Sequence, residues 1–175
     1  MTAREQLVLA SPAGLDPEIG RWLAAFEEVR RDTLAVLDEV AAGDVDRDLG
    51  DGGDSVGTLL YHVALVEVDW VFTDVLDQQD RIPRGLFPHD DRVEDGHLTP
   101  VHGESLDHHL ERLMRTRALV LGELRSMDAS EYHLARPRER FDVAPDWVVF
   151  HLIDHEVEHR VRLSTLRDGF AGNAG

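Results

Sequence analysis

The chain has 175 residues, of which 42% are hydrophobic, and its 18 basic and 35 acidic residues give a formal net charge of −17. This length and composition suit a single globular domain over residues 1–175, and the absence of cysteine excludes disulfides and thiolate ligands to a metal. The acidic charge disfavours nucleic acid as a partner. We find no signal peptide and no apolar run of the roughly 18–20 residues that a membrane span needs. We therefore expect a cytoplasmic protein.

Four segments are predicted to be amphipathic helices, because apolar residues recur in each at i, i+3 and i+4 spacing. Asp16 followed by Pro17 marks the start of the first helix, and Ser105 is expected to cap the third. We expect residues 1–14 and 169–175 to be loosely held ends. The predicted helices cover residues 16–42, 55–77, 105–127 and 144–168.

These segments, with little strand signal between them, predict an all-α fold, a four-helix bundle. Residues 78–104 form a long connection between the second and third helices, rich in proline, glycine and aspartate. The connection is long enough to run along a helix of about 30 Å, which permits a crossover. Connections of this length are often binding loops or lids. Residues 128–144 are predicted to be a further connection.

The last predicted helix carries His151, His155 and His159, spaced four residues apart on or beside its apolar face. An unpaired buried imidazole costs about 1–3 kcal/mol, so metal ligation is the most economical explanation for two of them. His151 and His159 are roughly 12 Å apart along a helix, too far for Zn–N bonds of about 2.0–2.1 Å to one ion. Either 151/155 or 155/159 is therefore the chelating pair. His62, on the inward face of the second helix, would complete an open three-histidine site of the kind found in catalytic metal centres.

The segment from His155 to His159 also matches the H-E-x-x-H motif of zincin proteases, with Glu156 as the general base. No Glu or His follows His159, and Thr165 stands where a metzincin has its third histidine. No strand is visible that could hold an extended peptide, so we reject the protease interpretation. Glu156 is then expected to be solvated or to support a ligand. Arg117, on the third helix, is expected to be a surface arginine whose stem covers apolar surface. The alternative is a buried guanidinium group, which would need an anionic partner.

Two segments, 55–70 and 151–160, resemble the DinB/YfiT-like family of metalloenzymes, four-helix bundles with a His…His-x-x-x-His metal triad. The resemblance spans nearly the whole chain. It implies that His62, His155 and His159 are the ligands of a divalent ion, Zn²⁺ or Ni²⁺, between which imidazole does not discriminate. The histidine that matches His151 recurs in relatives without being a ligand.

The chain departs from the family after its last ligand. Relatives usually continue His-Arg-Gly-Gln, whereas this chain has Val161 and Arg162 in place of Gly and Gln. We expect Val161 to widen the contact between helices or to face elsewhere. Arg162 is expected to pair with Glu158 on the helix surface.

The resemblance implies a metal-dependent enzyme that acts on a small-molecule substrate. Some relatives are transferases and isomerases that use a low-molecular-weight thiol cofactor such as bacillithiol or mycothiol, and the absence of cysteine is compatible with such an external thiol. A metal-dependent hydrolase is a close variant. The alternative is a non-enzymatic, stress-associated metal-binding bundle, which would form a homodimer through its exposed helix faces.

Overall fold

The structure is a computed structural model in which residues 4, 6–50 and 53–172 are described. It is an all-α fold, as predicted, with a minor two-stranded sheet. The parts of the expected loose ends at 1–3, 5 and 173–175 lie outside the described residues. The long helices are α1 (Pro17–Leu37), α2 (Val56–Asp69), α3 (Leu106–Arg125) and α5 (Pro145–Gly172).

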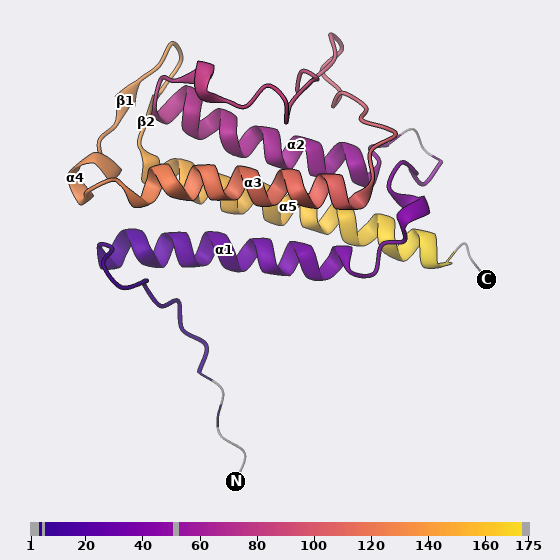
Figure 1. The fold of residues 1–175 in the computed structure, drawn as a ribbon, viewed down its shortest axis with the longest axis horizontal. Coiled ribbons are helices and arrows are strands. Elements are labelled where there is room, and N and C mark those ends of the chain that lie inside the picture. The colour runs from indigo at the N-terminus through magenta and orange to yellow at the C-terminus, as the bar shows by residue number, and fades with distance from the viewer. Residues whose placement is uncertain (1–3, 5, 51–52, 173–175) are drawn as a thin grey trace.

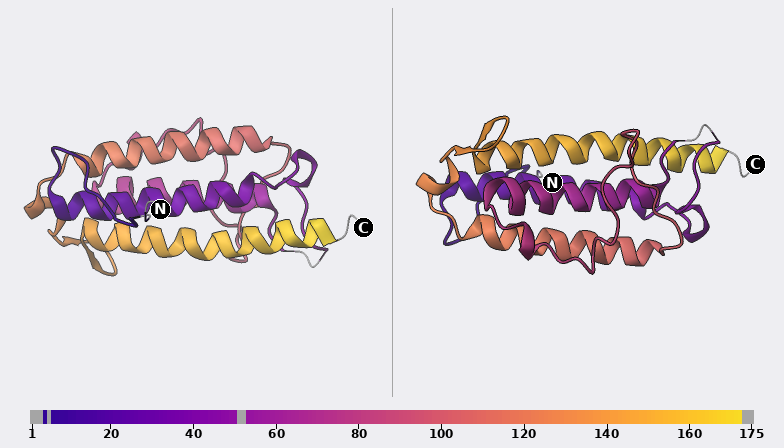
Figure 2. Two further views of the ribbon diagram at one scale, coloured as in Figure 1. Left: turned by 90° about the horizontal axis from the view of Figure 1, so that it is seen from below. Right: turned by 90° about the horizontal axis from the view of Figure 1, so that it is seen from above.

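The four long helices lie side by side as a bundle (Figures 1 and 2). Helices α1 and α5 run in one direction, and α2 and α3 run in the other. Because α2 and α3 are parallel, the connection between them returns along the length of the bundle, as its length allowed. This connection covers one side of α2 and forms part of the candidate site described below.

The start of each helix follows from its capping residue. The Asp16 carboxylate accepts a hydrogen bond from the Glu18 amide at 2.8 Å. Ser55 and Ser105 accept from amides in the first turns of α2 and α3, each at 3.2 Å. These caps explain why the predicted and observed starts agree to within a residue or two.

The helix ends differ more from the prediction. Helix α1 ends at Leu37, where the Val40 amide donates to the Leu37 carbonyl at 3.0 Å and turns the chain so that Val40 becomes buried. Helix α5 continues through Gly169 to Gly172. A Cβ atom at 169 would lie 2.5 Å from the Leu49 side chain, so this glycine permits close packing and does not end the helix.

Short elements fill the connections. The helical segment η1 (Ala42–Asp44) follows α1, and η3 (Gln79–Arg81) lies early in the long connection. The predicted second helix is α2 extended by the π-helical segment η2 (Trp70–Val75). Residues 128–144, expected to be a plain connection, contain α4 (Ala129–Tyr132) and a hairpin of β1 (Arg136–Pro137) and β2 (Asp142–Val143), all too short to show a periodic pattern.

Segment Val56–Val75 is long and apolar enough to cross a membrane, contrary to the expectation that no such run exists. Of its most apolar window, 72% is buried inside the bundle. The core helix of a soluble protein has these same properties.

The core consists of two hydrophobic clusters, one towards each end of the bundle. Along α3, Leu113 belongs to one cluster and Val120 to the other, and along α5 Leu163 and Leu152 are divided in the same way. A buried charged residue lies between the two clusters on each long helix: Arg30, Glu67, Arg117 and Glu156. We call these four residues the ion quartet.

Candidate metal site

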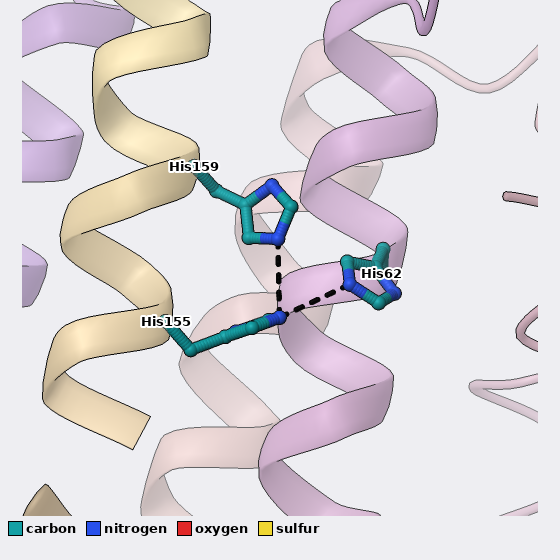
Figure 3. Close-up of side chains that lie close together, drawn as sticks. All are labelled: His62, His155 and His159. Carbon is teal, nitrogen blue, oxygen red and sulfur yellow. Dashed lines mark hydrogen bonds between the residues drawn. The ribbon is translucent and has the colours of Figure 1, made fainter. Parts of the chain in front are cut away.

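Three histidine side chains from two helices converge between α2 and α5 (Figure 3). The Nε2 atom of His155 lies 3.0 Å from Nε2 of His62 and 3.1 Å from Nε2 of His159. One ring nitrogen from each residue lies within 4.8 Å of the other two. The spacing of four residues puts His155 and His159 on one face of α5, and that face is turned towards His62 on α2.

The structure therefore selects 155/159 from the two pairs that helix geometry allowed. The ring of His151 is centred 6.0 Å from that of His155, and His151 lies outside the cluster. That the three clustered histidines bind a metal remains a prediction.

Asp91, in the long connection, holds the ring of His62. Its Oδ1 atom lies 2.5 Å from Nδ1 of His62. With Nδ1–H donating to this carboxylate, the Nε2 lone pair of His62 is free to face the cluster, the arrangement in which a second residue orients a metal-ligating histidine. Burial alone would raise the pKa of Asp91, but its hydrogen bond to His62 and the nearby positive charges bring this pKa below its usual range.

Sequence reasoning missed Asp91. It is one of several acidic residues in the long connection, and no local motif distinguishes it from Asp90 or Asp95.

The other two histidines are neutral in the metal-free protein at pH 7. Burial of its ring, followed by the positive charges that neighbouring histidines would carry, lowers the pKa of His155 to about 3. Burial, followed by the positive charge that His62 would carry if protonated and by the nearby Arg162, lowers the pKa of His159 to about 4. Neutral imidazoles offer lone pairs, the form in which histidine binds a metal.

This donor set fits a divalent cation. Three Nε2 atoms meet in one space with too few protons to hydrogen-bond every pair, so their facing lone pairs would repel each other without a positive charge between them. Nitrogen-rich sites suit Zn²⁺ and Ni²⁺. The Nδ1 atom of His159 is buried without a hydrogen-bond partner in the described part of the chain, so no second residue orients this ring as Asp91 orients His62.

A cavity of about 710 Å³ opens beside His62 and His155. Apolar side chains of α2, η2 and the long connection line it together with charged side chains, most of them from the connection. The lining includes Leu65, Trp70, Phe87, Arg84, Asp90 and Arg92. Its volume lies within the range of small-molecule pockets, about 300–1,000 Å³.

Glu156 and Arg117 are buried members of the ion quartet, so the expectations of a solvated Glu156 and a surface Arg117 were wrong. Glu156 is 1% exposed and Arg117 is 6% exposed. The Glu156 carboxylate accepts from Arg117 at 2.7 Å and from Arg30 Nε at 2.6 Å, and Glu67 accepts from both arginines at 2.6–3.1 Å.

These contacts make Glu156 unsuitable as a general base. Burial alone would raise its pKa, but Arg30 and Arg117 lower it below the usual range. A carboxylate held ionised between two guanidinium groups is a weak base, which supports the rejection of the zincin interpretation.

The ion pair formed by Arg162, shortly after the last histidine of the chain, also differs from the expectation. Arg162 pairs with Asp54, from the segment before α2, and not with Glu158. Val161 is 62% exposed and faces away from the bundle. Val161 therefore lies outside the contact between α2 and α5, in agreement with the expectation that it faces elsewhere.

Comparisons with known proteins agree with this architecture. The family model described as the DinB superfamily matches residues 25–161. Among solved structures, the chain resembles a conserved protein from Enterococcus faecalis with a TM-score of 0.68 and 16% identity, covering 86% of this chain and 95% of the other. At this identity the likeness concerns the fold alone. No curated protein sequence matches the chain.

Proposed function

The chain belongs to the DinB superfamily, and on this premise we propose that it binds one divalent metal ion, Zn²⁺ or Ni²⁺, through His62, His155 and His159. The observation that carries the proposal is the convergence of three Nε2 atoms from α2 and α5 in one space. Three protein ligands leave a further coordination position for a substrate or cofactor.

We further propose that the protein is a metal-dependent enzyme, specifically a transferase that uses a low-molecular-weight thiol. A bound divalent ion supplies Lewis acidity, which lowers the pKa of a thiol or water ligand. The histidines hold the ion, Asp91 fixes the orientation of His62, and the cavity walls bind the organic part of the substrate and limit access of water. Because the chain has no cysteine, the thiol must come from the cofactor.

The shape of the site favours an enzyme over a non-enzymatic metal-binding bundle. A purely structural or storage site would be closed by aliphatic side chains, whereas this cluster borders a cavity of about 710 Å³ with charged and aromatic walls. A hydrolase would use the same site, with water in place of the thiol. The cytoplasmic location and the homodimer remain predictions.

Metal content and activity test this proposal separately. Protein purified without added chelator should contain about one metal ion per chain by elemental analysis. His155→Ala should lose most of it, whereas the matched control His151→Ala, on the same helix outside the cluster, should retain it. Wild-type protein loaded with Zn²⁺ or Ni²⁺ should conjugate a small thiol to an electrophile. Metal binding without conjugation or hydrolysis would support the non-enzymatic alternative, and full conjugation by His155→Ala would overturn the metal-centred mechanism.

A further inference from the structure

A run of aromatic rings leads from the surface to the histidine cluster. The rings of Trp147 and His151 are stacked, with centroids 5.2 Å apart and planes inclined by 9°. Trp70 contacts both, with centroids 4.7 Å from His151 and 5.5 Å from Trp147. Phe141, from the hairpin side, stacks on Trp70 at 5.8 Å. We call Trp70, Phe141, Trp147 and His151 the aromatic wall.

The aromatic wall is continuous with the cavity. Trp70 and His151 line the same cavity as His62 and His155. The next ring along the wall after His151 is His155 itself, at a centroid distance of 6.0 Å. A ligand in the cavity can therefore touch the wall and the histidine cluster at the same time.

Packing of the core does not account for the outer part of the wall. Trp147 is 48% exposed and Phe141 is 39% exposed, although the protein carries a net charge of −17 and has few aromatic residues. Exposed apolar surface gathered in one place at the edge of a cavity is a common mark of a binding site.

The backbone at Trp70 is a second, independent observation. Trp70 begins the π-helical segment η2, in which the Leu76 amide donates to the Val71 carbonyl at 2.9 Å, five residues back. Single π-helical turns are rare and are found frequently at functional sites. Here the change of pitch occurs at the residue that joins the wall to the cavity.

From these observations we propose that the aromatic wall binds a planar, aromatic group of the substrate and so determines specificity for aromatic or conjugated small molecules. This inference rests on the proposed function only in placing the reactive end of the substrate at the histidine cluster. Ring faces in offset or near-parallel arrangement favour a planar partner over a saturated one of equal size. The continuity with the cavity favours a small molecule over a protein partner.

A matched pair of probes tests the proposal. The probes are 2-naphthoate and decahydro-2-naphthoate, which have the same charge and carbon skeleton but differ in planarity and aromaticity. Calorimetric titration into the Zn²⁺-loaded protein should show tighter binding of the planar probe. Trp147→Ala should weaken the binding of 2-naphthoate about tenfold and leave the saturated probe little changed, because a stacked pair is worth on the order of a factor of ten. Trp147→Phe should restore most of the preference.

Phe150→Ala is the control. Phe150 lies on the same helix, is 51% exposed, and makes no ring contact with any residue that the structure describes, so its removal should not change binding of either probe. Equal affinity of wild-type protein for the two probes, or an unchanged preference in Trp147→Ala, would overturn the proposal.

The same titration on metal-free protein separates this inference from the proposed function. Elemental analysis and Zn²⁺ titration show whether the histidine cluster binds metal, and the probe preference in metal-free protein shows whether the wall binds rings. If the protein bound no metal but still preferred the planar probe, the metal site alone would be refuted and the aromatic wall would stand.

Discussion

Replacing Glu156 by glutamine is expected to destabilise the metal-free protein by about 3–5 kcal/mol. The Glu156 carboxylate accepts hydrogen bonds from Arg30 at 2.6 and 3.1 Å and from Arg117 at 2.7 Å. Glutamine has one acceptor oxygen, and its amide group would meet a guanidinium group as a second donor. The quartet would also change from two positive and two negative charges to a net positive charge in a buried position.

The magnitude follows from burial. All four side chains of the quartet are between 2% and 8% exposed, so water does not replace the lost carboxylate. Typical proteins have a total free energy of unfolding of about 5–15 kcal/mol, so the expected loss is a large part of the whole. The same argument predicts that replacing all four charges by apolar residues of similar volume (Arg30→Met, Glu67→Leu, Arg117→Met and Glu156→Leu) is much less harmful, because no charge is left unpaired.

Urea unfolding followed by circular dichroism at pH 7, with a chelator present, measures this effect without a contribution from metal. Glu158→Gln is the matched control, since Glu158 is exposed on the same helix two residues away. This variant should change the free energy of unfolding by no more than about 0.5 kcal/mol. If Glu156→Gln unfolded at the same urea concentration as Glu158→Gln, the quartet would not have the energetic role that we assign to it.

Three further predictions concern the histidine cluster. Asp91→Asn should weaken Zn²⁺ binding about 10–100-fold in a competition titration, because His62 loses the acceptor that fixes its ring, and unchanged affinity would contradict this. Zn²⁺ at about 100 times its Kd should stabilise wild-type protein by about 2.7 kcal/mol, raising the Tm in a thermal melt, and should not raise that of His159→Ala. Metal-free protein should lose stability as the pH falls from about 6.5 towards 4. In this range the unfolded chain takes up protons on His155 and His159. The folded chain does not, because the pKa values of these residues are about 3 and 4 there. Urea midpoints across this range should fall in wild-type protein and fall less in a double His→Gln variant, and an equal slope in both would refute the assignment.

Much of the fold could be predicted because its signals are local. A capping side chain, a proline in the first turn and a repeat of apolar residues at helical spacing all act within a few residues, so Asp16 and Ser105 marked the starts of their helices correctly. The four-residue spacing that makes His155 and His159 a possible chelating pair is also a local signal, because both residues belong to one helix. Which of the two possible pairs faces α2 depends on the rotation of α5 within the bundle, and this is settled by the structure.

The rest of the site depends on partners far apart in the chain. Arg30 and Glu156 are separated by 126 residues, and Arg117 and Glu156 by 39, so no local pattern joins them. Taken alone, an arginine near an apolar stripe is more often a surface residue than a buried one, and for Arg117 this general rule was wrong. Asp91 was missed for the same reason, because it reaches His62 from an irregular connection.

The ion quartet spans all four long helices and shares α2 and α5 with the histidine cluster, and this arrangement constrains both. On α5, Glu156 follows His155 directly, so the two side chains point about 100° apart around the helix axis. With Glu156 fixed in the quartet, His155 must face the gap beside α2, where the cavity lies. On α2, Glu67 follows His62 by five residues and enters the same quartet. We infer that this buried charged layer fixes the relative rotation of α2 and α5 and so holds the histidines beside the cavity.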